Sequence, residues 1–517
     1  MTPRACARGG DRARASARPG VLGAIVLVLA AGGPDAAAQG PDRAAAEALE
    51  RRAKDTGELA AYVACGQAYL ALYNQDPDGR GSEELLYDAA VCFEQGGAIG
   101  VAITTYTRLV ELTGADREVR ARAMAHLVGA YEQIAFYDQA AQVLERYADE
   151  YGATRPDAAL ALDRAAQLRR GLGQHDRAIA DTMKYVRLSS TSARDRAAAF
   201  FSVADLHEAH GDTGALIAHL RRYLEAHGAG GAPELRVAAH ARLGQALWAQ
   251  SCPVAPIDGS CLRVVRDRPR PGDGAGAPRG QAAPSTCGAA SRLQVEVVTR
   301  DARLVREAQR EFAAAIAVFE RSGRPGQGYG RYLHALALFH QSEPAYEAYL
   351  RVEFPARLDF DPRAPAVAKA SRAKLEQYLA RKAAAGAVVQ RGYEEVARTA
   401  DAAMTLASIA RRGQMQQHAA DALAAADIPV RLRGDVQAVE GFCTTLQAVV
   451  GPLEASAAAA YAMCLDKSTA LGWFSAWSRL CERQLEQLWP DRFPPARELR
   501  PVVAAPGVLT DVEAVGP

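Results

Sequence analysis

The sequence predicts an all-α protein, a solenoid of helix–turn–helix units followed by a C-terminal helical module. Apolar residues recur, in several successive copies, at the offsets of a 34-residue helix–turn–helix unit. Alanine, which has the highest helix propensity, is abundant, and aromatic residues make up only 7% of the chain. A chain of 517 residues is too long for a single compact core, so an array of repeats or several domains is expected.

Residues 1–38 have the three-part pattern of a secretory signal peptide. Five arginines precede an eleven-residue apolar run, and three alanines end the segment before Gln39. The run is too short to cross a bilayer; an uncleaved anchor is the alternative. No lipoprotein cysteine follows the run, and no later segment looks apolar enough to span a membrane. We therefore expect a periplasmic or envelope-associated protein with no transmembrane segment after cleavage.

The charge balance argues against a nucleic-acid partner. The chain has 61 basic and 60 acidic residues, a formal net charge of +1. Removal of residues 1–38 takes away five arginines and two aspartates, so the remaining chain carries +1 − 3 = −2. A phosphate-binding surface would need a clear basic excess.

Residues 39–250 contain the clearest repeats. In 86–109, apolar and small residues fall at offsets 4, 7, 8, 11, 17, 20, 24 and 27 of the unit, and 124–147 repeats this spacing. Further copies include Leu162 and Phe200. Offsets 4 to 11 form an apolar stripe on the first helix and offsets 20 to 27 one on the second, with small residues where the helices touch. This spacing resembles the tetratricopeptide-repeat (TPR) family over roughly 55–380, which implies an extended groove for protein segments.

The next part of the chain interrupts and then continues the repeats. Residues 251–292 are rich in Pro, Gly, Arg and Asp, and we interpret them as an insertion loop at the surface. Residues 293–411 are expected to be TPR-like helices again, starting near 301–321 with Phe312 and Ile316 toward the core. A further pair of helices is expected between Gly330 and Pro355, followed by long Ala-rich helices.

Residues 412–500 form the predicted C-terminal helical module, and 501–517 a disordered tail. Pro452 begins a long predicted helix, and Trp473 and Trp477 share one face of another. The C-terminal part of the chain, over about 150 residues, resembles TPR proteins of the adventurous gliding-motility machinery. The segments that carry the resemblance are Leu358–Asp361, Ala422–Pro429, Cys464–Ser468, Gly472–Glu482 and Phe493–Pro494. The resemblance implies a non-enzymatic part of an envelope-spanning complex. Trp473 and Trp477 are candidate partner contacts, and core packing is the competing interpretation.

Eight cysteines follow the signal segment, and disulfides are plausible in an oxidising compartment. The candidate pairs are Cys65 with Cys92, Cys252 with Cys261, and Cys443 with Cys464. Cys287 and Cys481 would then be left over. Connectivity does not follow from sequence, and a buried thiol is the alternative for each.

No catalytic, cofactor or metal site is predicted. His207-Glu208-Ala209-His210 lacks the i, i+4 histidine spacing that a zinc-peptidase helix needs, and no CxxC pair occurs. We therefore expect a non-enzymatic scaffold that binds envelope proteins through its TPR groove or its C-terminal module. A ligand- or glycan-binding module and an accessory to a cell-wall enzyme are the alternatives.

Overall fold

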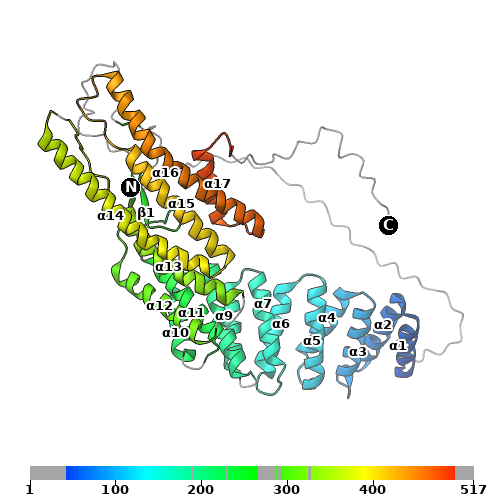
Figure 1. Cartoon of the computed structure of the whole chain (residues 1–517). Helices are drawn as coiled ribbons and strands as arrows, with labels where there is room; N and C mark the ends of the chain where they lie inside the picture. The colour runs from blue at the N-terminus through cyan, green and yellow to red at the C-terminus, as the bar shows by residue number, and fades with distance from the viewer. Residues whose placement is uncertain are drawn as a thin grey trace, which may run out of the picture. The chain divides into compact units, whose positions relative to one another are not determined.

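The predicted all-α class is confirmed by the computed structural model, which describes residues 42–188, 191–228, 231–265, 286–287, 294–323, 328–361 and 363–494. Seventeen helices and one two-stranded sheet occur in these residues (Figure 1). The signal segment 1–38 and the tail 501–517 lie outside them. The chain divides into two compact units, residues 1–130 and 131–517, and the boundary falls within α5 (Arg117–Gln133).

The first unit is built from α1 (Arg43–Thr56), α2 (Leu59–Gln75), α3 (Ser82–Gln95), α4 (Ile99–Glu111) and most of α5. Helices α1 to α4 pack in sequence order, and Arg122 of α5 forms an ion pair with Glu84 of α3. Small residues let the helices approach. A Cβ on Gly66 of α2 would lie 2.8 Å from the ring of Phe93 on α3. The predicted stripe residues Leu86, Ala89 and Phe93 are all buried, as an amphipathic repeat helix requires.

The second unit continues with helices that again pack in sequence order: α6 (Tyr137–Tyr151), α7 (Ala158–Gly171), α8 (His175–Arg187), α9 (Ala193–His210), α10 (Thr213–His227), α11 (Pro233–Gln250), α12 (Ala302–Arg321), α13 (Tyr329–Leu350), α14 (Pro365–Arg398), α15 (Ala402–Ala424), α16 (Val436–Leu471) and α17 (Ala476–Leu488). Helix α12 packs against α11 although 51 residues separate them. Gly244 occupies the small-residue offset of its unit. A Cβ built on it would lie 2.7 Å from a ring carbon of Phe312. Phe312 is fully buried and Ile316 is half-buried against the same core.

The insertion between α11 and α12 differs from a structureless loop at its described ends. Strands β1 (Leu262–Val265) and β2 (Gln294–Val297) pair antiparallel. The strands are short, and their alternation of apolar and polar residues covers only four positions, too few to distinguish from loop sequence. The residues between them, apart from 286–287, lie outside the described part of the chain.

Helix α13 is continuous where the sequence indicated two helices. Pro344 lies inside it, and a proline cannot donate a hydrogen bond to the carbonyl four residues earlier. That carbonyl belongs to His340, and Gln309 Nε2 of α12 donates to it at 3.0 Å. A neighbouring helix therefore satisfies the group that Pro344 leaves free, so the helix continues through the proline.

Two boundaries near the C-terminus are also corrected. The predicted module boundary at 411–412 lies within α15, which continues through Gly413. At Gly413 the Tyr461 ring of α16 approaches, and a Cβ built on the glycine would lie 2.6 Å from it. Helix α16 starts at Val436, well before Pro452, which it contains. Among the described residues, α16 is the one helix long and apolar enough to cross a membrane by length and composition alone, a property that core helices of soluble proteins share.

Candidate interaction surfaces

Three exposed apolar side chains gather at the turn between α16 and α17. Leu471 is 53% exposed, Trp473 48% and Phe474 75%. We call these three residues the aromatic turn. Exposed tryptophan is common at protein contacts, where it supplies a large and rigid apolar surface.

The backbone of the aromatic turn is held in one conformation. Gly472 adopts φ 59°, which closes the end of α16, and the Trp473 N–H donates to the Ser468 carbonyl at 3.0 Å. On the other side, Ser475 caps α17: its hydroxyl accepts from the Trp477 N–H at 3.2 Å. The aromatic side chains therefore extend from a defined backbone, which lowers the entropy lost on binding.

Trp473 and Trp477 do not share a helix face as predicted. Trp473 precedes α17, whereas Trp477 lies in its first turn and is half-buried. The Trp477 ring packs edge-on against Phe339, with centroids 5.6 Å apart, and the Arg411 guanidinium lies 4.9 Å from its centroid. Core packing thus accounts for Trp477, and of the two candidate partner contacts Trp473 is the exposed one.

All eight cysteines of the described residues form disulfides. The sulfurs of Cys65 and Cys92, and of Cys252 and Cys261, are bonded in the pairs suggested from sequence. The suggested pair of Cys443 with Cys464 is wrong. Two other bonds take its place: Cys287 with Cys443, and Cys464 with Cys481.

The reason for this error is geometric. Cys443 and Cys464 are both on α16, 21 residues apart, which is about 31 Å along a helix at 1.5 Å per residue. A disulfide needs Cα atoms within about 7 Å. In the observed pairs the Cα atoms are 5.4 Å apart for Cys287 and Cys443, and 6.4 Å apart for Cys464 and Cys481.

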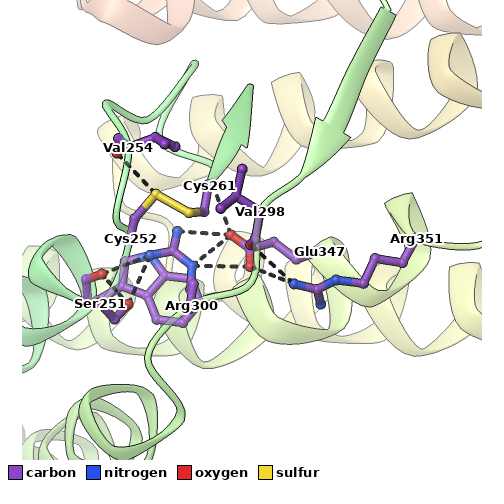
Figure 2. The surroundings of a disulfide bond; sticks show 9 residues. Ser251, Cys252, Val254, Cys261, Val298, Arg300, Glu347 and Arg351 are labelled. Carbon is purple, nitrogen blue, oxygen red and sulfur yellow. Dashed lines mark hydrogen bonds and ion pairs between the residues drawn. A yellow bond between two sulfur atoms is a disulfide. The ribbon is translucent and has the colours of Figure 1, made fainter. Parts of the chain in front are cut away.

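The short loop closed by Cys252 and Cys261 lies against a buried ion pair (Figure 2). Arg300 Nε donates to Glu347 Oε1 of α13 at 2.8 Å, and both side chains are at most 5% exposed. The Cys261 N–H donates to the same carboxylate at 3.1 Å, and Arg300 Nη1 donates to the Trp248 carbonyl at 2.8 Å. Burial lowers the pKa of Arg300, and the Glu347 charge opposes that shift. Glu347 thereby joins the disulfide loop to α13, and Arg300 joins the same carboxylate to α11.

A second buried ion pair lies one turn earlier on α13. Arg411 Nη2 of α15 donates to Glu343 Oε2 at 2.7 Å, and each side chain is 1% exposed. The Tyr393 hydroxyl of α14 donates to Glu343 Oε1 at 2.6 Å. The Arg411 guanidinium also lies 4.6 Å from the Tyr346 ring centroid. This carboxylate therefore joins three helices, and we interpret the group as structural.

A buried lysine without a carboxylate partner lies where α13, α14 and α15 meet. Lys382 Nζ donates to the Tyr349 carbonyl at 2.7 Å and lies 3.1 Å from His418 Nδ1. The amine also lies 3.7 Å from the Tyr349 ring centroid. Burial lowers the pKa of Lys382 to about 7 and that of His418 to about 3. Nothing in the sequence pattern marks Lys382, which reads as one of many basic residues on a helix.

Polar side chains on the repeat helices α2, α5 and α7 differ in their exposure. Asn74, Gln133 and Arg170 are exposed, but Arg169 is completely buried. Its guanidinium binds Glu145 at 2.6 Å and also Asp138. Arg169 is therefore part of the packing of α6 and α7 and is not available to a partner.

The first unit contains a shallow hollow of about 300 Å³. It lies over α3 between α2 and α4, lined by Leu70, Leu86, Val101 and neighbouring residues of α4. Arg108 stands at its edge, with the guanidinium 4.6 Å from the Tyr73 ring centroid. The lining is mainly apolar, so the hollow suits an apolar side chain or a small apolar ligand.

No group of three or more His, Cys, Asp or Glu in the described residues is arranged to hold a metal ion. His207 and His219 lie with ring centroids 5.6 Å apart, but His219 Nε2 is 2.7 Å from the Phe200 carbonyl. Burial lowers the pKa of His219 to about 4, so its ring is neutral near pH 7. These histidines pack as aromatic side chains between α9 and α10.

The chain was compared with protein families, curated proteins and solved structures. No protein-family model matches the chain, and no curated protein matches it. Solved structures similar to it include a tetratricopeptide repeat protein from Parabacteroides merdae, 14% identical, covering 57% of this chain and 99% of that one, with a TM-score of 0.24. The C-terminal part of a TPR repeat-containing protein from Cytophaga hutchinsonii is 13% identical, covers 64% and 93%, and has a TM-score of 0.26.

TPR-like repeats of a kinesin light chain from Podosopora anserina are 18% identical, cover 33% of this chain and 88% of that one, and give a TM-score of 0.22. Several solved structures similar to the chain are thus helical-repeat proteins of the type that its sequence resembles. At these TM-scores, superposition carries no argument about individual residues. The repeat assignment rests on the helices of this chain and on their small-residue contacts.

Proposed function

We propose that this protein is an exported, non-enzymatic scaffold of the cell envelope that binds other envelope proteins, with the aromatic turn as its principal contact. The exposure of Trp473 and Phe474 on a fixed backbone carries the proposal. A contact of this kind gives affinity because large aromatic surface leaves water with little loss of conformational freedom.

The cysteines support the envelope location. Eight described cysteines lie close enough in four pairs to be bonded. Structural disulfides persist in oxidising compartments and are rare in the cytosol. This agrees with the signal pattern of residues 1–38. The resemblance of residues 412–500 to gliding-motility TPR proteins makes that machinery the first complex in which to look for a partner.

The proposal is tested by comparing capture of envelope proteins by three forms of the chain that starts at Gln39. These are the unchanged chain, the double variant Trp473→Ala with Phe474→Ala, and Leu379→Ala as the control. Leu379 is 49% exposed on α14, so the control removes a similar apolar side chain elsewhere. We expect the double variant to lose a defined set of envelope proteins that the control retains. Equal capture by all three would refute the aromatic turn as the contact.

A ligand-binding function is favoured by one observation, the apolar hollow of the first unit. A ligand that binds only the folded protein raises its thermal stability. A rise in Tm with an apolar or glycan ligand, lost on Val101→Asp, would favour this function. Val101 lines the hollow and is 46% exposed, so the added charge is tolerated by the fold.

A further inference from the structure

We infer that the outer face of α14 is a second binding surface, which holds the protein against an anionic lipid bilayer. We call it the basic face and define it by five exposed side chains: Lys369, Arg372, Lys374, Arg381 and Arg391. The inference goes beyond the proposed function, because it concerns a different helix from the aromatic turn and a ligand that is not a protein. The attachment is peripheral, since α14 lies on the bilayer and does not cross it.

The positive charge of α14 is a local excess in a chain that is nearly neutral as a whole. Between residues 365 and 391 the helix has six basic residues and one acidic residue, Glu376. Lys382 is buried on the inner side, so five basic side chains and one acidic side chain are exposed. Further acidic residues of α14 come only near its end, at Glu394 and Glu395. The exposed side of the helix therefore attracts anions although the whole chain does not.

The charges of the basic face are not used within the protein. In the part of the chain that the structure describes, none of its five side chains forms an ion pair or a hydrogen bond with another residue. Exposed arginines elsewhere are paired, as Arg122 is with Glu84 and Arg164 with Glu132. The basic face can therefore bind phosphate groups without first breaking internal contacts.

The packing of α14 keeps the basic face toward solvent. Helices α13 and α15 pack against its inner side, and α14 lies at the edge of the layer that it forms with α15 and α16 (Figure 1). Lys382 Nζ donates to the Tyr349 carbonyl at 2.7 Å, and the Tyr393 hydroxyl donates to Glu343 Oε1 at 2.6 Å. These contacts fix the rotation of the helix about its axis, so its basic side chains stay outside.

Exposed valines lie in line with two of the basic side chains. Val367, Lys374, Arg381 and Val388 follow one another at intervals of seven residues, so they lie along one side of the helix. Each valine is 49% exposed. At a bilayer, apolar side chains enter the headgroup boundary while the stems of Lys and Arg extend beside them and bring their charges to the phosphates. Helix α14 is about 51 Å long at 1.5 Å per residue, which gives an extended line of contact.

The basic face has no aromatic side chain, which argues against nucleic acid and protein as its ligands. Both tyrosines of α14, Tyr378 and Tyr393, are 1% exposed. Single-stranded nucleic acids stack their bases on aromatic side chains, and the strongest protein contacts centre on tryptophan, tyrosine or arginine in fitted pockets. The middle of the basic face has exposed alanines instead, among them Ala373, Ala380 and Ala384. Lipid headgroups need no such pocket, because they move to meet the charges.

The expected strength follows from the number of charges. One basic side chain close to an anionic bilayer improves partitioning about five-fold. Removal of three such charges should therefore weaken binding on the order of 100-fold. The attraction is screened over about 8 Å at an ionic strength of 0.15 M, so binding should also weaken as salt is added.

The experiment measures sedimentation of the chain from Gln39 to Pro517 with phosphatidylcholine vesicles that contain or lack phosphatidylglycerol. The test variant replaces Lys369, Lys374 and Arg381 by glutamine. The control replaces Arg303, Arg306 and Arg310 of α12, which are also exposed, so both variants lose three positive charges. We expect the unchanged chain and the control to bind the anionic vesicles and not the neutral ones, and the test variant to bind on the order of 100-fold more weakly.

A photo-crosslink reports which side of the protein meets the lipid. Benzoylphenylalanine at Ala380, in the middle of the basic face, should crosslink to phosphatidylglycerol on irradiation. The same group at Ala313, an exposed alanine of α12, should not. Equal crosslinking from the two positions would overturn the inference.

Three results of the vesicle assay would also overturn the inference. They are no binding of the unchanged chain to anionic vesicles, undiminished binding of the test variant, and an equal loss in both variants, which would assign the attraction to net charge. If the chain binds polyglutamate or single-stranded DNA through these residues but no vesicles, the face belongs to another class of ligand and the lipid contact is refuted. The proposed scaffold fails separately, because capture of envelope proteins is tested at Trp473 and Phe474 and vesicle binding is tested on α14.

Discussion

The buried amine of Lys382 should make the stability of the protein depend on pH above neutrality. Its pKa is lowered by burial to about 7 from the usual 10.5. Between these values the unfolded chain holds the proton that the folded chain has lost, so stability rises with pH in this window. The full penalty, present below pH 7, is about 5 kcal/mol at about 1.4 kcal/mol per pH unit. Between pH 7 and pH 9 about 2 kcal/mol of it should disappear.

The assay is urea unfolding at pH 7 and pH 9 of three forms: the unchanged chain, Lys382→Met and Lys369→Met. Methionine keeps the length of the side chain without the amine, and Lys369 is an exposed lysine of the same helix. We expect the rise between pH 7 and pH 9 in the unchanged chain and in the Lys369 variant, and its loss in Lys382→Met. His418, the nearest titrating group, has a pKa lowered to about 3 and does not contribute in this range. An undiminished rise in Lys382→Met would refute the reasoning.

Three further predictions concern buried contacts. Glu343→Gln leaves the Arg411 guanidinium buried without its carboxylate and should lower the free energy of unfolding by about 3–5 kcal/mol, measured by urea unfolding. Gly244→Ala forces a methyl group against the Phe312 ring and should cost about 1–3 kcal/mol, seen as a lower Tm; an unchanged Tm would show that the two helices separate without cost. Cys443→Ser breaks the disulfide to the insertion and should speed proteolysis between β1 and β2 without changing the far-UV circular dichroism; unaltered proteolysis would contradict the role of that bond.

The repeats were predictable from sequence because their determinants are local. Offsets of apolar and small residues within one unit specify two helices and the point where they meet, as Gly66 with Phe93 and Gly244 with Phe312 illustrate. The same local rules placed a break between two helices at Pro344 and a module boundary beside Gly413, although a helix continues through each position. At both positions a side chain from another helix decides the outcome: Gln309 satisfies the carbonyl before the proline, and Tyr461 fills the space above the glycine.

The candidate site was only partly predictable. The tryptophans could be picked out from the sequence, but their exposure could not. It depends on where α17 begins: the helix starts at Ala476, so Trp473 lies in the turn before it and Trp477 lies in its first turn. The cysteine pairs separated by 27 and 9 residues could be suggested from nearness along the chain. The bond between Cys287 and Cys443 spans 156 residues and has no local signal. Lys382 and His418 lie 36 residues apart on different helices, and only the packing of those helices brings them together.

Under the proposed export, the two carboxylates of α13 bear on the order in which the chain folds. Glu347 needs Arg300, which comes earlier in the chain, but Glu343 needs Arg411, which follows it by 68 residues. If the chain crosses a membrane from its N-terminus, Arg300 emerges before α13 and Arg411 emerges after it. Glu347 can then pair at once, whereas Glu343 has no partner until α15 emerges. Helix α13 can complete its packing only after α15 has emerged. The second unit would therefore finish folding late in translocation. A chaperone that binds the emerging chain would therefore be expected to engage it around α13, during the interval in which Glu343 has no counter-charge.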